Sequence, residues 1–85
     1  MEIVKTIKRI IALDKADKRI PVEKSLEDDT LFAIWESICD KRELLSNNLK
    51  AYINAPDDRR DRYIRRKCVK LACKLLSVDY YRVIR

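Results

Sequence analysis

Residues 31–53 read LFAIWESICDKRELLSNNLKAYI, and most of their apolar side chains recur at alternating steps of four and three residues. The members of this series are Leu31, Trp35, Ile38, Arg42, Leu45, Leu49 and Tyr52, with Ile34 and Ile53 beside them. Such heptad-like spacing puts the series on one face of a helix, where it packs against other helices. The pattern therefore predicts a helix over about residues 26–54. A kink or break at Ser46–Asn48 is the alternative, because Ser and Asn side chains compete for backbone hydrogen bonds.

One charged residue, Arg42, belongs to this apolar series. We expect its guanidinium to pair with a carboxylate or to reach solvent at the edge of a bundle. The alternative is that this end of the face opens onto a partner, which makes Arg42 a candidate for a second interface.

The segment before the long helix is expected to hold one helix and one loop. Ile3, Ile7 and Ile10 share a helical face, which predicts a helix near residues 2–14. Pro21 disfavours the helical conformation at the residue before it, so residues 16–24 are expected to form a loop. Ser25 then starts a Ser-Leu-Glu-Asp pattern, which predicts a capping box for the long helix.

The segment after the long helix is expected to form one more main helix. Asn54 is a suitable cap, and the apolar spacing that follows predicts a helix over residues 55–76. Ser77 is expected to be a joint before a short helical tail at 78–84. With no glycine, two prolines and no alternating strand pattern, the 85 residues predict an all-α fold. We expect a single domain over 1–85, a small antiparallel bundle of three main helices with a short C-terminal helical tail.

The helix predicted over 55–76 carries both apolar and basic side chains. At 100° per residue, one arc is expected to face the core: Ile64, Cys68, Leu71, Ala72, Leu75 and Leu76. Together with Trp35, Ile38 and Leu45, Leu71 and Leu75 are expected to be buried. The opposite arc is basic, and Asp58 and Asp61 are placed to offset Arg62 and Arg65 at the i,i+4 spacing.

Charge is unevenly distributed along the chain. The formal net charge is +6, and residues 56–85 account for all of it, because acidic and basic residues balance over 1–55. Such asymmetry is compatible with three kinds of binding partner: an acidic protein face, a nucleic acid or an anionic membrane surface. The candidate partner-binding residues are Arg59, Arg62, Arg66, Lys67, Lys70, Lys74, Arg82 and Arg85.

The residue types that are absent argue against catalysis. Without glycine or histidine there is no phosphate-binding glycine loop, no imidazole base and no mixed Cys/His zinc site. Cys39, Cys68 and Cys73 fit neither a metal motif nor a disulfide framework, so we expect small buried thiols, unpaired, in a reducing cytoplasm. We expect no enzyme, cofactor or metal, and the apolar runs are too short for a transmembrane segment.

These patterns favour a small non-enzymatic regulatory or inhibitor protein that binds the acidic surface of another protein through its basic helix face. The small, glycine-free, highly charged form is typical of accessory factors of phages and mobile elements. The alternative is a nucleic-acid-binding protein that uses the basic 59–74 helix. Its C-terminus, ACKLLSVDYYRVIR, resembles the last part of a helix-turn-helix motif, although Ser77 replaces the turn glycine and the last helix is short. A homodimer is left open.

Overall fold

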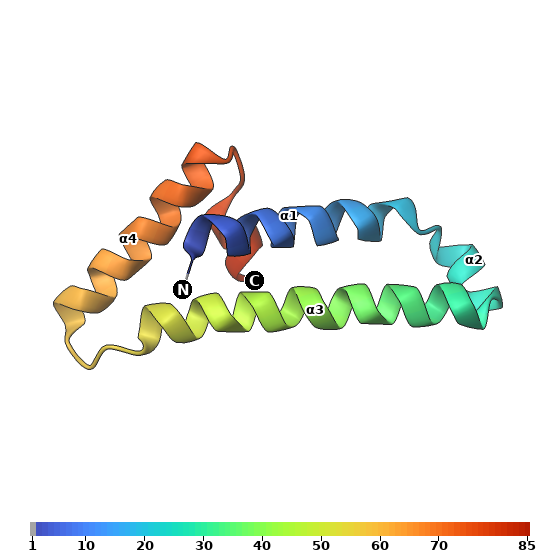
Figure 1. The fold of residues 1–85 in the computed structure, drawn as a ribbon, viewed down its shortest axis with the longest axis horizontal. Coiled ribbons are helices and arrows are strands. Elements are labelled where there is room, and N and C mark those ends of the chain that lie inside the picture. Colours follow the sequence, from blue (N-terminus) through green and yellow to red (C-terminus); the bar gives the residue numbers. More distant parts are fainter. Residues whose placement is uncertain (1) are drawn as a thin grey trace.

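The computed structural model describes residues 2–85 and contains five helices and no strand within them. In chain order they are α1 (Ile3–Arg19), α2 (Val22–Glu27), α3 (Asp29–Asn54), α4 (Arg59–Leu75) and α5 (Tyr80–Ile84). α1 and α3 run antiparallel, α4 folds back over one end of this pair, and α5 returns the chain between them (Figure 1). The predicted all-α class, with three main helices and a short C-terminal helix, is confirmed.

The predicted loop over 16–24 is wrong. α1 continues to Arg19, and only Ile20 and Pro21 separate it from α2. Pro21 does restrict Ile20, whose backbone is extended at φ −90° and ψ 115°. That restriction ends α1 at the preceding residue and has no effect further upstream. Pro21 itself then stands as the N-cap residue of α2.

Around α3, the predicted capping box is corrected, and the predicted continuity of the helix is confirmed. Ser25 lies inside α2, where its hydroxyl donates to the Val22 carbonyl at 2.7 Å, so it caps nothing. The cap of α3 is Asp28, whose carboxylate accepts from the Thr30 amide at 2.9 Å. α3 shows no break at Ser46, because this buried side chain donates to the Val83 carbonyl of α5 at 2.8 Å instead of competing within its own helix.

The buried hydrophobic side chains gather at one end of the molecule. They are Ile7, Ile10, Leu49, Ile53, Val69, Cys73 and Val83, contributed by α1, α3, α4 and α5. The α3 face predicted from the heptad spacing is the one that packs inward, with Leu49 fully buried. Trp35, Ile38 and Leu45, expected to be buried, are only half-buried, because fewer helices cover α3 there.

The molecule is elongated, with extents of 49 × 25 × 18 Å. Its radius of gyration is 15.0 Å, whereas a compact chain of this length has about 12 Å. The long α1–α3 pair projects beyond the region that α4 and α5 cover (Figure 1). Within residues 2–85, no helix combines the length and apolar character that crossing a bilayer requires.

Candidate partner-binding surface on α4

α4 begins four residues later than the sequence predicts. Asn54 is not its cap, because the side-chain amide of Asn54 donates back to the Lys50 carbonyl at 2.9 Å. The cap is Asp58, which accepts from the Arg60 amide at 2.8 Å. Residues 55–58 therefore connect α3 to α4, and the Asp58 carboxylate lies at the positive end of the α4 dipole.

The C-terminal end of α4 closes in a Schellman motif. The Val78 amide donates to the Cys73 carbonyl at 2.9 Å, and the Ser77 amide donates to the Lys74 carbonyl at 3.1 Å. Ser77 has φ 57°, the left-handed conformation that glycine usually supplies at this position. The predicted joint at Ser77 is confirmed. The motif turns the chain so that Val78 packs against the core cluster beside Cys73.

This turn selects a different face of α4 for the core than the one predicted. Val69 and Cys73, which lie outside the predicted arc, are buried, whereas Ala72 and Leu76 of that arc pack against the core cluster as predicted. Four residues expected inside form instead an exposed row, which we call the α4 apolar stripe: Ile64, Cys68, Leu71 and Leu75. Ile64, Leu71 and Leu75 are 48%, 58% and 77% exposed. α4 carries two apolar rows, and the return of Val78 and Val83 buries the row that contains Cys73.

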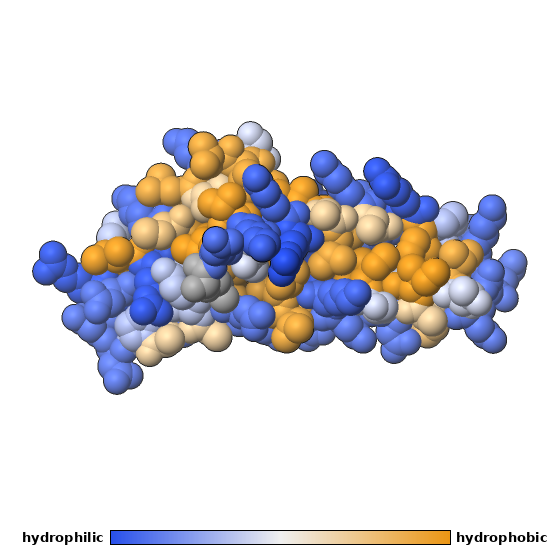
Figure 2. Space-filling view, in the orientation of Figure 1, coloured by the Kyte–Doolittle hydropathy of each residue, from blue (hydrophilic) through white to orange (hydrophobic). Residues whose placement is uncertain are grey.

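The structure brings most of the predicted partner-binding residues together along α4, in a row that we call the basic ridge. Its members are Arg59, Arg62, Arg66, Lys67, Lys70 and Lys74, of which Arg62 is half-buried and the others are exposed. Arg66, Lys67, Lys70 and Lys74 line a hollow together with Tyr63 and Leu71. Hydrophobic and hydrophilic side chains therefore lie next to each other over α4 (Figure 2).

The ridge is not neutralised from within the chain. The pairs expected between Asp58 and Arg62 and between Asp61 and Arg65 do not form, since the only ion pair among residues 2–85 joins Arg42 to Asp14. Arg65 turns inward, where it donates to the Tyr52 carbonyl at 2.9 Å and stacks over the Tyr52 ring at 4.6 Å. The basic ridge thus presents its positive charge to solvent.

Tyrosines border the ridge, a feature that sequence reasoning missed. The Lys67 ammonium lies 5.9 Å from the centre of the Tyr63 ring, and the Lys70 ammonium lies 5.2 Å from Tyr80 and 5.8 Å from Tyr81. Burial raises the pKa of Tyr80 above its ordinary value, and the nearby Arg66 charge opposes that rise. The i,i+4 spacing of Tyr63 and Lys67 is a signal that could have revealed the first contact. The contacts across to α5 depend on the turn at Ser77.

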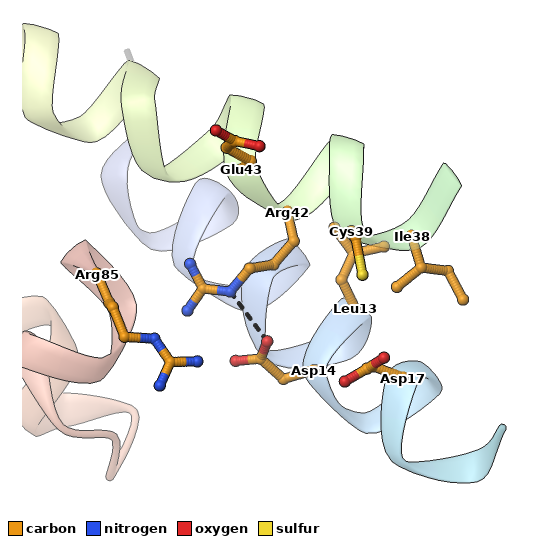
Figure 3. A pocket seen from close by; sticks show the side chains of 8 residues that line it. All are labelled: Leu13, Asp14, Asp17, Ile38, Cys39, Arg42, Glu43 and Arg85. Carbon is orange, nitrogen blue, oxygen red and sulfur yellow. Dashed lines mark hydrogen bonds and ion pairs between the residues drawn. The ribbon is translucent and has the colours of Figure 1, made fainter. Parts of the chain in front are cut away.

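Arg42 joins the long helix to the C-terminus (Figure 3). Its Nε donates to Asp14 at 3.0 Å, and its two terminal nitrogens donate to the carbonyls of Val83 and Arg82 at 3.2 and 2.6 Å. The guanidinium also donates to Ser46. The expected pairing with a carboxylate is confirmed, and the side chain is only 14% exposed. A second interface at Arg42 stays a prediction.

The two arginines of the C-terminal tail do not join the hollow on α4. Arg85 lines a separate pocket, between α1 and α3, with Asp14, Asp17 and Cys39 (Figure 3). Arg82 is exposed on α5, and its backbone carbonyl accepts from Arg42. Arg82 and Arg85 therefore lie apart from the basic ridge, and their role in partner binding stays a prediction.

The three thiols are free, as predicted, but their burial differs. Cys73 is buried and Cys39 half-buried, whereas Cys68 is exposed on the α4 apolar stripe, contrary to prediction. Burial raises the pKa of the Cys73 thiol, and the Asp79 carboxylate raises it further. Burial likewise raises the pKa of Cys39, with Asp17 and Asp40 adding to the rise.

No family model, curated protein or solved structure matches this chain. Among residues 2–85, no three or more His, Cys, Asp or Glu side chains gather in a way that could hold a metal ion. On the α4 face, the exposed apolar stripe adjoins basic side chains that form no ion pair within residues 2–85. That face is suited to binding an anionic partner that also offers apolar surface.

Proposed function

We propose that this chain is a small non-enzymatic regulatory or inhibitor protein that binds an acidic surface of another protein through α4. The observation that supports this function is the exposure of the α4 apolar stripe beside the basic ridge. Apolar side chains gathered in an exposed row mark interaction surfaces, and protein interfaces combine a desolvated apolar centre with a polar rim. A phosphate backbone would engage the charges and leave Leu71 and Leu75 unused.

The positive charge of the basic ridge gives the proposed interface its selectivity. Complementary charge raises the rate of encounter and excludes partners of the same sign. An inhibitor needs no further chemistry, because covering a functional surface of its target is sufficient. The exposed Cys68 thiol lies within this surface, so we place the function in a reducing compartment such as the cytoplasm.

Nucleic-acid binding is the second candidate, and the tyrosines favour it. The ammonium group of Lys70 on α4 lies next to the Tyr80 and Tyr81 rings of α5, and Tyr81 is exposed. Basic and aromatic side chains interleaved in this way suit single-stranded nucleic acid, whose bases stack on aromatic rings.

A pull-down from host lysate, performed with and without nuclease, tests the proposed function. The bait is compared with Leu71→Ser/Leu75→Ser and with Arg66→Gln/Lys70→Gln/Lys74→Gln. We expect one protein to be retained after nuclease treatment and to be lost with both variants. A matched control, Lys5→Gln/Lys8→Gln/Arg9→Gln, removes the same charge from exposed positions of α1 and should retain the partner.

The same proteins distinguish the second candidate in titrations with labelled single-stranded DNA and RNA. For nucleic-acid binding, the Arg66→Gln/Lys70→Gln/Lys74→Gln variant should flatten the slope of log affinity against log salt by about one unit per lost phosphate contact. Tight nucleic-acid binding at physiological salt, together with loss of every captured protein on nuclease treatment, would reject the protein-binding proposal.

A further inference from the structure

The α4 apolar stripe has the spacing of a coiled-coil seam. Its residues follow one another at steps of four, three and four, the alternation of a and d positions in a heptad. Ile64 and Leu71 then occupy d positions, and Cys68 and Leu75 occupy a positions. Each is exposed, so the seam faces solvent with no helix of residues 2–85 packed against it.

Basic residues follow one edge of this seam in the same register. Arg60, Lys67 and Lys74 are seven residues apart, and each stands directly before an a position. This is the g position, whose side chains form ion pairs with a partner helix in coiled coils. All of them are exposed, and none takes part in an ion pair within residues 2–85.

The other edge of the seam turns toward the rest of the molecule. The e positions are Arg65 and Ala72, both half-buried, and Arg65 is held against Tyr52 of α3. Along the two edges, a partner helix therefore meets free charge on one side only, and that charge is positive, while the exposed Asp61 occupies the a position that follows Arg60. The seam from Ile64 to Leu75 rises by about 16 Å, or about three helical turns.

We propose that α4 pairs with an amphipathic helix of a partner protein, one that carries Leu or Ile along its own seam and Asp or Glu along the edge that meets Arg60, Lys67 and Lys74. This inference rests on the proposed function and names the partner's chemistry. Cys68, the smallest side chain of the seam, leaves room for a large apolar side chain of that helix.

A second copy of this chain is a poorer occupant. In an antiparallel pair the g positions of the two helices face each other, so Lys67 and Lys74 would meet basic residues. In a parallel pair they would face Arg65 and Ala72, which offer no carboxylate. Each arrangement would also bring together two chains of net charge +6. Charge complementarity therefore selects an acidic helix of another protein.

Synthetic helices of three heptads test the proposal against the full chain by fluorescence anisotropy. One peptide carries Leu at a and d and Glu at e and g, and its matched control carries Lys at e and g. We expect the Glu peptide to bind on the order of tenfold more tightly than the Lys peptide, and the preference to shrink with added salt.

Variants of α4 assign that preference to the seam and its basic edge. Leu71→Ser/Leu75→Ser should abolish binding of both peptides while circular dichroism stays unchanged, because both side chains are exposed. Lys67→Glu/Lys74→Glu should reverse the preference toward the Lys peptide. The matched charge change on α1, Lys5→Glu/Lys8→Glu, should leave the preference as it was.

Several outcomes would overturn the proposal. Equal affinity for the Glu and Lys peptides, or no binding of either, would reject a charged helical partner. If the lysate partner is still lost with the α4 variants in that case, the proposed function survives and its helical mode fails. Sedimentation of the unmodified chain as a dimer, with Leu71→Ser/Leu75→Ser as a monomer, would identify a second copy as the occupant instead.

Discussion

The two ends of the α1–α3 pair differ in what covers them. At one end, the first half of α1 and the last third of α3 meet α4 and α5, and there Ile7, Ile10 and Leu49 are fully buried. At the other end, the last part of α1 lies along the first half of α3 with only α2 added (Figure 1). Hydrophobic side chains remain visible along α1 and α3 there (Figure 2), and Phe32 and Ile34 are exposed.

The difference shows that a continuous helix and a buried core have different requirements in this chain. α3 is continuous through both ends, yet its apolar face becomes buried only where helices distant in sequence close over it. Stability arises mainly from burying apolar area, and regions with few buried contacts open locally at lower free energy. We therefore regard the end with α4 and α5 as the stable unit and the α2 end as the one that opens first.

The largest expected effect comes from truncating one apolar side chain of α3 at each end of the molecule. Leu49→Ala should lower the free energy of unfolding by about 2–5 kcal/mol, because it leaves a cavity in the core. Ile34→Ala, on the same helix at the α2 end and 47% exposed, should lower it by less than about 1 kcal/mol. Urea titration measures both values. Equal losses would show that burial is not concentrated at the α4–α5 end.

The next effect concerns Arg42, which lies between the two ends. Arg42→Met removes the donors to the Val83 and Arg82 carbonyls and leaves Asp14 without its partner. A hydrogen bond to a charged group contributes about 1.5–3 kcal/mol to stability, and contributions within one network are not additive, so a loss of at least about that size is expected. Hydrogen exchange at Val83 should rise more than exchange at Leu49. Unchanged protection of α5 would mean that apolar packing alone holds it.

A smaller effect should distinguish Asp28 from Ser25 as the N-terminal cap of α3. Asp28→Ala should cost about 1 kcal/mol, because its carboxylate accepts from the Thr30 and Leu31 amides at the start of α3. Ser25→Ala should cost less than about 0.5 kcal/mol, since its hydroxyl bonds only to the Val22 carbonyl of its own helix. Thermal denaturation compares them. A larger loss for Ser25→Ala would restore the capping box that the sequence predicts.

The smallest effect is a decline in stability at alkaline pH. Burial raises the pKa of Cys73 and of Tyr80, so the unfolded chain loses these protons at a lower pH than the folded chain does. The free energy of unfolding should therefore be constant through neutral pH and fall as pH rises above about 8.5. Urea titrations in that range measure the slope, and Cys73→Ala should reduce it. A rise in stability with pH would contradict the environment assigned to Cys73.

Much of the local structure follows from the sequence. The steps of four and three residues over 31–53 identify the inward face of α3, and the lack of glycine and of strand patterns predicts a helical chain. The exact starts of the helices were harder to predict from the sequence. Asp28 and Asp58 cap helices where Ser25 and Asn54 were expected, because each segment offers several residues able to accept from a free amide.

The candidate surface on α4 shows most clearly which features could not be predicted from the sequence. Its basic residues could be named from the sequence, since a charge is a property of the residue itself. Its apolar stripe could not, because Leu71 and Val69 lie on two rows of comparable apolar character, and burial depends on what packs against each row.

The sequence by itself determined that this chain is helical, which face of α3 turns inward and where the positive charge accumulates. The fold in three dimensions determined which face of α4 is buried and that Arg42 reaches the carbonyls of α5. The physical reason is that periodicity and charge act within one helix. Burial, in contrast, requires segments distant in sequence to meet. The turn at Ser77 brings them together, and its left-handed backbone conformation is one that glycine usually indicates in a sequence.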